Sequence, residues 1–198
     1  LAQETFLGIM TAEADRMRVL IEDLLALSQV EDGQRQRPQT EISITAVIAQ
    51  AYGHVEQAMQ VAGVQFTSSA AAALPPVLGD HTQLVQVFVN LLENAIFYGA
   101  GSQSPRVQID VEIVEFDLEL HTPVLRICVS DTGPGIPAHL VPRLTERFFR
   151  VDGHRSLNAG GTGLGLAIIK HILQRHRGRL DVSSVEGSGT TFSVVLPL

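Results

Sequence analysis

A run of alternating glycines directly before a helix constrains this chain more than any other stretch. Residues 160–166 read GGTGLGL and lead into the apolar-periodic segment LGLAIIKHILQRH, which predicts a helix that starts near Leu164. Gly161, Gly163 and Gly165 allow positive φ and close approach of an anion to the backbone. The first-turn amides and the dipole of the helix favour such an anion. The run therefore predicts a phosphate loop, although a plain helix entry after a flexible loop explains this motif equally well.

The two commonest phosphate motifs do not match the run. A P-loop places a lysine directly after its last glycine, whereas Leu166 follows Gly165 and the only lysine of the chain is Lys170. A dinucleotide fingerprint needs a third glycine or alanine at a fixed offset behind a strand, where this chain has Leu166 or Ile168. The run thus indicates a nucleotide site of another kind.

A second glycine-rich turn, DTGPGIP at 131–137, follows an apolar strand-like segment. Asp131 ends that segment, and Gly133 and Gly135 leave open space beside its carboxylate. The carboxylate can accept a hydrogen bond from an exocyclic amine such as that of adenine. An aspartate before glycine also commonly bonds the backbone of its own turn, so this motif alone leaves both interpretations open.

Two asparagines lie on a predicted helix over residues 81–98, which Asp80 or a neighbour caps. Asn90 and Asn94 are four residues apart and share a face. Together with phosphate oxygens, their amide oxygens suit Mg²⁺, which takes few protein ligands. An isolated asparagine pair more often caps a helix or bonds a neighbouring one. The occurrence of all three motifs in one chain favours a single nucleotide site built from them.

Composition limits the possible classes of protein. The chain has 198 residues, of which 45% are hydrophobic and 18% charged, which fits one compact domain with an appendage. The net charge of -7 argues against a nucleic-acid surface, and no apolar run approaches the roughly 20 residues of a membrane span. Cys128 is the only cysteine, lies in an apolar run and suits a core thiol in a reducing cytoplasm.

The order of predicted elements indicates an α+β fold, a two-layer sandwich in which helices cover one face of a mixed sheet. One long bundle helix over residues 1–29 precedes it, because Met10, Met17 and Leu24 recur at heptad spacing. A polar linker over residues 31–40 follows. The expected strands are 41–44, 64–69, 106–120, 123–130, 179–185 and 190–197, the expected helices about 45–61, 81–98, 139–147 and 164–176, with a hairpin turn at 121–123.

At these motifs the sequence resembles the ATP-binding catalytic domain of sensor histidine kinases, in the ATPase superfamily shared with gyrase, MutL and the large heat-shock chaperone. NLLENAIFYG resembles the N box, DTGPGIP the first glycine box, ERFFRVD the F box and GGTGLGLAI the second glycine box. RFFRVDGHRS and HILQRHRGRL are most similar to the phosphate-regulon sensor kinase group. The resemblance covers nearly the whole chain. It implies the second helix of the dimerisation and phosphoacceptor domain at 1–30, a linker at 31–40 and the catalytic domain at 41–198.

The resemblance also implies ATP and Mg²⁺ as cofactors. Asp131 would bind adenine with Thr190 nearby, and the stretch 151–160 would be a mobile lid. Asn90 and Asn94 would be the catalytic and metal-binding pair. The implied nucleotide-binding residues are Asn90, Asn94, Tyr98, Asp131, Gly133, Gly135, Ile136, Arg150, Arg155, Gly161, Thr162, Gly163, Leu164, Gly165 and Thr190.

The chain departs from the family pattern at three places. Phe97 replaces a lysine of the N box, for which Arg150 and Arg155 can substitute, and Thr145 replaces a phenylalanine of the F box. The phosphoacceptor box is absent, and none of the seven histidines fits it. We therefore expect the acceptor histidine to lie on a helix outside this chain.

The resemblance implies a histidine kinase that passes phosphate from ATP to that histidine and then to an aspartate of a response-regulator receiver domain. It further implies a homodimer through the dimerisation domain, no nucleic-acid partner, a cytoplasmic location and membrane contact only through segments absent here. One alternative is an ATP hydrolase or clamp of the same superfamily. Such enzymes place a glutamate where this chain has Asn90, and Glu93 lies roughly 300° further around the helix. A non-catalytic nucleotide-binding dimerisation module is the other alternative, which Phe97 and Thr145 keep open.

Overall fold

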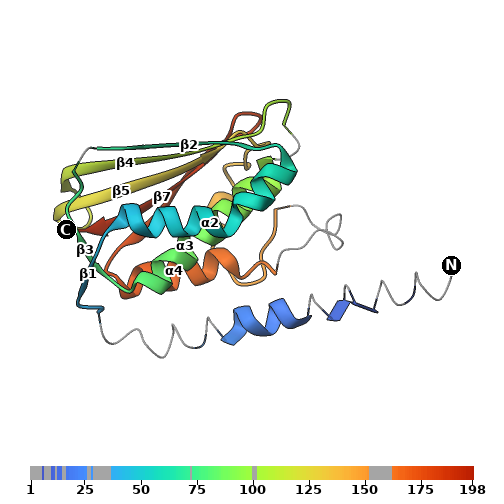
Figure 1. The fold of residues 1–198 in the computed structure, drawn as a ribbon, viewed down its shortest axis with the longest axis horizontal. Helices are drawn as coiled ribbons and strands as arrows, with labels where there is room; N and C mark the ends of the chain where they lie inside the picture. The colour runs from blue at the N-terminus through green and yellow to red at the C-terminus, as the bar shows by residue number, and fades with distance from the viewer. Residues whose placement is uncertain are drawn as a thin grey trace.

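The computed structural model describes residues 6, 10–11, 13–14, 17–25, 28, 37–71, 73–99, 102–151 and 162–198. Every described residue between 6 and 28 is helical, as the heptad pattern predicts, and we call this segment the first helix. It runs along the outside of the domain on the side of the helical layer (Figure 1). Met10, Met17 and Leu24 of its seam expose 53%, 58% and 47% of their surface. Residues 31–36 of the expected linker lie outside the described part, and Thr40 already begins a strand.

The remainder forms the predicted two-layer α+β sandwich. Its five-stranded sheet has the order β2-β4-β5-β7-β6, in which only β2 and β4 pair in parallel, and β1 pairs with β3 in a separate small sheet. Helices α2, α3 and α4 cover one face of the large sheet (Figure 1). The elements are β1 (Thr40–Ile42), α2 (Ile44–Ala62), β2 (Gln65–Ala70), β3 (Val77–Gly79), α3 (His81–Gly99), β4 (Arg106–Asp117), β5 (Thr122–Asp131), the 3₁₀ turn η1 (Val141–Arg143), α4 (Gly165–Arg175), β6 (Arg179–Val185) and β7 (Gly189–Pro197).

The alternation of side chains along the strands explains why the sheet has one helical face. In β5, Leu125, Ile127 and Val129 are buried beneath the helices. Cys128 and Ser130 point to the other face, where they contact hydroxyls of β7. The expected core thiol is therefore half-buried on the open face of the sheet.

Helix α3 lies between α2 and α4 and packs on β4 and β5. Asp80 caps it as predicted, because the side-chain Oδ1 of Asp80 accepts a hydrogen bond from the amide of Gln83 at 3.1 Å. Phe88 and Leu91 on its inner face are fully buried. The central helix of the layer therefore carries both the core contacts and the asparagine pair.

Two local predictions were wrong. The turn between β4 and β5 spans residues 118–121 instead of 121–123, because the carboxylate of Asp117 accepts hydrogen bonds from the amides of Glu119 and Leu120. Thr122 and Pro123 already belong to β5. The short helix expected at about 139–147 is only the 3₁₀ turn η1 flanked by other turns.

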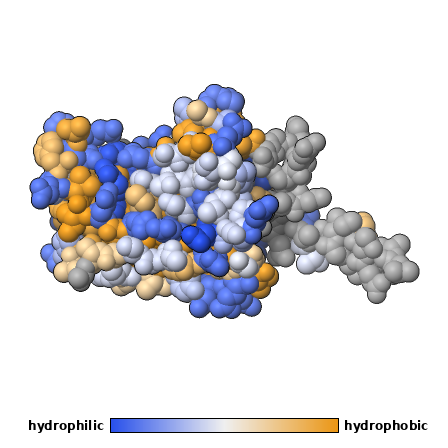
Figure 2. Space-filling view, turned by 90° about the horizontal axis from the view of Figure 1, so that it is seen from above, coloured by the Kyte–Doolittle hydropathy of each residue, from blue (hydrophilic) through white to orange (hydrophobic). Residues whose placement is uncertain are grey.

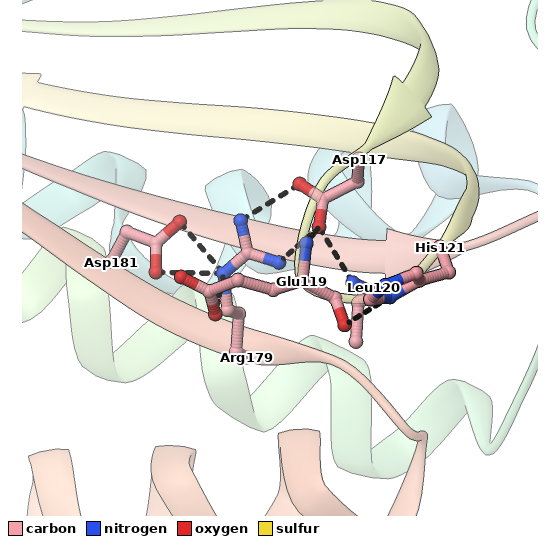
Figure 3. Close-up of polar contacts among 6 residues, drawn as sticks. All are labelled: Asp117, Glu119, Leu120, His121, Arg179 and Asp181. Atoms are coloured by element: carbon pink, nitrogen blue, oxygen red, sulfur yellow. Dashed lines mark hydrogen bonds and ion pairs between the residues drawn. The ribbon is translucent and has the colours of Figure 1, made fainter.

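A cluster of ion pairs fastens the β4–β5 turn to the start of β6 (Figure 3). The guanidinium of Arg179 contacts both carboxylate oxygens of Asp117 at 2.7 and 2.8 Å, and its Nε contacts Asp181 at 3.0 Å. Asp117 is buried, and the hydrogen bond from Arg179 holds the pKa of Asp117 well below its usual range. The cluster lies at the end of the sheet away from Asp131, because Asp117 is at one end of the paired part of β4 and β5 and Asp131 is at the other.

The surface is of mixed character. Figure 2 shows polar and apolar residues interspersed over one face, with apolar atoms gathered at the end where the β4–β5 turn lies in Figure 1. Ile113, Phe116 and Leu118 on that hairpin are exposed. Within the described residues, every helix is too short or too polar to cross a membrane.

Candidate functional site

Asp131 ends β5 directly opposite Thr190 of β7, so two strands far apart in sequence bring these side chains together. The Oδ1 atom of Asp131 accepts a hydrogen bond from the amide of Gly133 at 2.7 Å. Burial raises the pKa of the Asp131 carboxyl, and the amide bonds from Gly133 and Thr190 offset part of that rise. The turn interpretation and the ligand interpretation are therefore compatible, because a carboxylate has about four lone-pair sites and these two amides occupy only some of them.

The glycines of this turn are required by close backbone approaches. A Cβ on Gly133 would lie 2.7 Å from Oδ1 of Asp131 and 3.0 Å from the carbonyl oxygen of Tyr98. Gly135 has φ of 72°, and a Cβ there would collide with the carbonyl oxygen of Val185. The turn consequently packs tightly against α3 on one side and the β6–β7 hairpin on the other.

Ser184 of β6 holds the same corner together, and the sequence motifs did not point to it. Its Oγ accepts from the amide of Ile136 at 2.8 Å and donates to the carbonyl of Gly189 at 3.0 Å. The Oγ of Ser184 also lies 2.9 Å from Oγ1 of Thr190, which is buried. Since the proton of Ser184 goes to Gly189, Thr190 donates to Ser184 and keeps acceptor capacity.

A pocket with about 880 Å³ of empty space, part of it open to solvent, lies over this corner. Most of the predicted site residues that the structure describes meet there. The pocket is lined by Asn94, Tyr98, Asp131, Pro134, Gly135, Ile136, Leu144, Phe149, Arg150, Val151, Gly163, Gly165, Leu166, Thr190 and Phe192.

The asparagine pair spans this pocket and a second, adjoining cavity of about 1190 Å³. Asn94 lines both, whereas Asn90 lines only the second. A Cβ on Gly165 would fill the space 3.7 Å from Nδ2 of Asn90, so the glycine keeps room beside that amide. The two cavities also share Tyr98, Arg150 and Gly165, so they adjoin each other.

Glu93 also lines the second cavity, contrary to the helical-wheel argument that it faces elsewhere. The wheel angle of about 300° is only about 60° in the other direction, and the cavity is wide enough to include both residues. Burial and the nearby charge of Asp23 raise the pKa of Glu93. A carboxylate therefore stands beside the asparagines.

The glycine loop leads into α4 as predicted. Gly163 has φ of 72°, and a Cβ there would lie 2.8 Å from the carbonyl carbon of Phe148. Leu164 occupies the N-cap position, its side chain is buried in the core and it offers no capping bond to the first turn. The amides that begin α4 at Gly165, which lines both cavities, are therefore available to an anion.

A few predicted site residues are placed differently. Gly133 lines neither cavity, and Thr162 lines only the second one. Leu164 lines neither cavity and contributes through its backbone, since its amide bonds Oγ1 of Thr162 at 3.2 Å. Arg155 and Gly161, together with residues 152–160 of the expected lid, lie outside the described residues.

The comparison with protein families decides the assignment. The family model described as histidine kinase-, DNA gyrase B-, and HSP90-like ATPase matches residues 79–198. The chain belongs to this family. Its matched part contains every motif of the site, from the asparagine helix α3 to the hairpin that carries Thr190.

Within this ATPase family, the curated relatives are sensor kinases. The phosphate regulon sensor protein PhoR of Pseudomonas aeruginosa is 37% identical over 184 residues, which is 93% of this chain and 39% of that protein. The sensor-like histidine kinase SenX3 of Mycobacterium tuberculosis is 35% identical over 185 residues, which is 93% of this chain and 43% of that protein. The chain thus spans less than half the length of these relatives, and the predicted resemblance to histidine kinases is confirmed.

Solved structures of histidine kinases share the fold. Mycobacterial MprB superposes with a TM-score of 0.67 at 28% identity, over 80% of this chain and 97% of that one. Full-length ShkA in complex with AMPPNP gives 0.79 at 21% identity, over 100% of this chain and 39% of that one. ThkA in complex with the response regulator TrrA gives 0.72 at 22% identity, over 98% and 51%.

Apart from Tyr98 and Ile136, the apolar lining of the pocket was not predicted. Leu144, Phe149 and Phe192 supply much of it, and the guanidinium of Arg143 stacks 4.4 Å from the centre of the Phe149 ring. One signal was available for Phe192, because it lies two residues after Thr190 and so shares its face of β7. Leu144 and Phe149 lie outside regular helices and strands, so no hydrophobic periodicity could predict that they line the pocket.

Proposed function

We propose that this chain binds Mg·ATP and delivers the γ-phosphoryl group to a histidine on a helix outside it. One observation carries the proposal. The Asp131–Thr190 corner, the asparagine helix and the start of α4 line two adjoining cavities that share Asn94 and Gly165. The membership of the ATPase family supports ATP as the nucleotide.

In this proposal the apolar pocket holds the adenine ring and Asp131 selects it. The ring would lie among Ile136, Leu144 and Phe192, and the carboxylate of Asp131 would accept from the exocyclic amine. Guanine carries a carbonyl at that position and would oppose the carboxylate with an acceptor. Adenine selectivity would follow from this one carboxylate.

The phosphates would lie where the two cavities join. Arg150 and the first residue of α4, Gly165, line both cavities, and the N-cap residue of α4 makes no side-chain capping bond. In the proposal, the amides of this first turn and Arg150 would supply the positive charge that the absent N-box lysine would carry. Positioning of the phosphoryl group, with neutralisation of its charge, is the main demand of such transfer.

The residues present fit a magnesium ion. Asn90 and Asn94 offer neutral amide oxygens one helical turn apart, and Gly165 leaves space beside Asn90. Mg²⁺ is held by few protein ligands alongside phosphate and water. When bound, the ion would neutralise charge on the phosphates. Asn90 and Asn94 would fix its place relative to the phosphate loop.

We further propose that the full-length protein is a cytoplasmic histidine kinase that dimerises through the bundle to which the first helix belongs. The exposed seam of Met10, Met17 and Leu24 supports a helical partner. A response-regulator receiver domain would take the phosphoryl group onto an aspartate, as the complex of ThkA with its response regulator suggests by analogy.

ATP hydrolysis is the second candidate, and Glu93 is the observation that favours it. Asn90 cannot take a proton from water, but the carboxylate of Glu93 lines the same cavity. A Glu93→Gln variant keeps the shape of the side chain and loses its basicity. Release of phosphate that depends on Glu93 would identify the chain as a hydrolase.

The decisive experiment mixes the chain with γ-labelled ATP, Mg²⁺ and a separately prepared acceptor-helix domain of a related kinase. Label on a histidine of that domain, lost in Asn94→Ala and kept in Glu93→Gln, supports the kinase. Label released as phosphate, and lost in Glu93→Gln, supports the hydrolase. ATP binding with neither outcome supports the non-catalytic module.

A further inference from the structure

A hydrogen bond between two of the described residues joins the first helix to the phosphate loop, residues 162–165. The Oγ1 of Thr162 donates to Oδ2 of Asp23 at 2.5 Å, across 139 positions of sequence. Asp23 lines the second cavity together with Asn90, Asn94 and Gly165. The first helix thus reaches the part of the site where we place the phosphates.

Near Asp23, the described residues of the first helix bury little apolar surface: Leu20 is half-buried, and Val19, which also lines the second cavity, exposes 39% of its surface. Asp23 is half-buried, whereas its neighbours Ile21, Leu24 and Leu25 expose about half or more of their surface. Glu22 bonds Arg18 on the exposed side of the same helix at 2.8 Å. A contact in which a charged hydrogen bond is accompanied by little apolar burial is readily reversed.

Thr162 cannot serve Asp23 and a phosphate at once. Its hydroxyl has one proton, which it gives to Asp23, while its oxygen accepts from the amide of Leu164 at 3.2 Å. Phosphate oxygens at neutral pH only accept hydrogen bonds. A phosphate beside the start of α4 would therefore compete with Asp23 for the same proton.

Charge acts in the same direction. Asp23 and Glu93 both line the cavity, and a triphosphate that enters it adds like charge at short range. Docking of the first helix and binding of a triphosphate therefore oppose each other in two ways, through competition for the Thr162 proton and through repulsion between like charges.

We propose that the Asp23–Thr162 contact is a latch, which holds the first helix against the phosphate loop and which a nucleoside triphosphate releases. The proposal rests on the proposed ATP site. By thermodynamic reciprocity, the latch weakens triphosphate binding by the same factor by which the triphosphate weakens docking of the helix. Release of the helix at the moment of ATP binding would free it to move relative to the donor phosphate.

Nucleotide affinity tests the latch in the whole chain. Asp23→Asn removes the charge and keeps the shape, and Asp23→Ala removes the acceptor as well. Both should bind ATP at least about fivefold more tightly than the parent chain in calorimetry, the lower end of usual coupling between two sites. Adenosine, which has no phosphate, should bind all three chains equally. Glu22→Gln, which makes the same charge change on the exposed side of the helix, should leave ATP affinity unchanged.

Hydrogen exchange gives a second readout. The amides of residues 17–25 should exchange faster when ATP is added to the parent chain and should not respond to adenosine. In Asp23→Ala they should exchange fast without nucleotide. These changes report undocking of the helix, which a purely structural role of Asp23 in the fold would not tie to phosphate.

The outcomes separate the latch from the ATP site itself. Unchanged or weaker ATP binding by Asp23→Asn, with ATP still bound by the parent, overturns the latch and leaves the proposed function standing. Weaker binding would mean that Asp23 assists the phosphates or their cation. Failure of every chain to bind ATP removes the proposed function, and the latch with it.

Discussion

The backbone amide of Asp80 donates a hydrogen bond to Nε2 of His176 at 2.9 Å, joining the start of α3 to the end of α4. The other ring nitrogen, Nδ1, lies 2.7 Å from the carbonyl oxygen of Ile172. Because Nε2 accepts, Nδ1 carries the proton, and the ring is neutral. The carboxylate of Asp80 caps α3 and lies 3.7 Å from Arg175, so one residue ties together both helices that carry the site.

The first prediction concerns this neutral ring. Burial lowers the pKa of His176 below its ordinary value, so the unfolded chain binds this proton more readily than the folded one. Its contribution to stability is present above about pH 6.5 and is lost as the pH falls below that value. Urea unfolding should show this loss in the parent chain and a smaller loss in His176→Gln. Parallel pH profiles would contradict the assignment.

The second prediction concerns Asp131. A hydrogen bond to a charged group contributes roughly 1.5 to 3 kcal/mol, so Asp131→Asn should weaken ATP binding about 10- to 100-fold and reduce the preference over GTP. Ser130→Ala is the matched control, because Ser130 adjoins Asp131 but bonds Thr191 on the open face of the sheet. Calorimetry that finds equal ATP affinity in folded Asp131→Asn would exclude Asp131 from the site.

The third prediction concerns the metal. Asn94→Ala should abolish phosphoryl transfer and the part of ATP affinity that depends on Mg²⁺, while metal-free binding through Asp131 persists. Titrations with Mg²⁺ and with a chelator separate the two parts. An identical Mg²⁺ dependence in the variant and the parent would place the ion elsewhere.

The fourth prediction compares two glycines with similar backbone angles. Gly135 and Gly187 have φ of 72° and 79°, but a Cβ would collide with Val185 only at Gly135. Gly187→Ala should cost the strain of a positive φ alone, on the order of 1 kcal/mol, whereas Gly135→Ala should cost clearly more and also weaken ATP binding. Equal losses of unfolding free energy in the two variants would show that the backbone around Gly135 shifts to make room for the Cβ.

The fifth prediction concerns the ion cluster at the far end of the sheet. Because Arg179 lowers the pKa of Asp117, the stabilisation is present above about pH 4 and is lost as the pH falls further. Asp117→Asn should destabilise the fold at pH 7 and make little difference in strong acid. Asp181→Asn should have a weaker effect on stability at both pH values, because the side chain of Asp181 is more exposed than that of Asp117.

Local patterns predicted the elements well. The alternation in β5 and β7 and the apolar period of α3 and α4 follow from burial of one face, and the cap at Asp80 follows from local chemistry. The turn after β4 was misplaced because Thr122 and Pro123 look like turn residues. Pro123 is tolerated so near the start of a strand, while Asp117 bends the chain earlier.

Long-range features could not be predicted in the same way. Nothing local signals that β2 pairs in parallel with β4, or that Ser184 bonds the amide of Ile136. Whether Glu93 lines the cavity depends on the width of the cavity, which a helical wheel cannot predict. The motifs located the polar half of the site, and the apolar half emerged only from packing.

The position of β7 has a consequence for folding of the chain during its synthesis. This strand lies between β5 and β6 although it is the last in sequence, and it supplies Thr190 and Phe192 to the pocket. When the chain has been synthesised only as far as residue 188, β5 lacks its partner β7, and β6 has no strand to pair with. Such a nascent chain lacks the wall of the pocket that carries Thr190 and Phe192, and we expect the proposed nucleotide site to form only after β7 has inserted between β5 and β6.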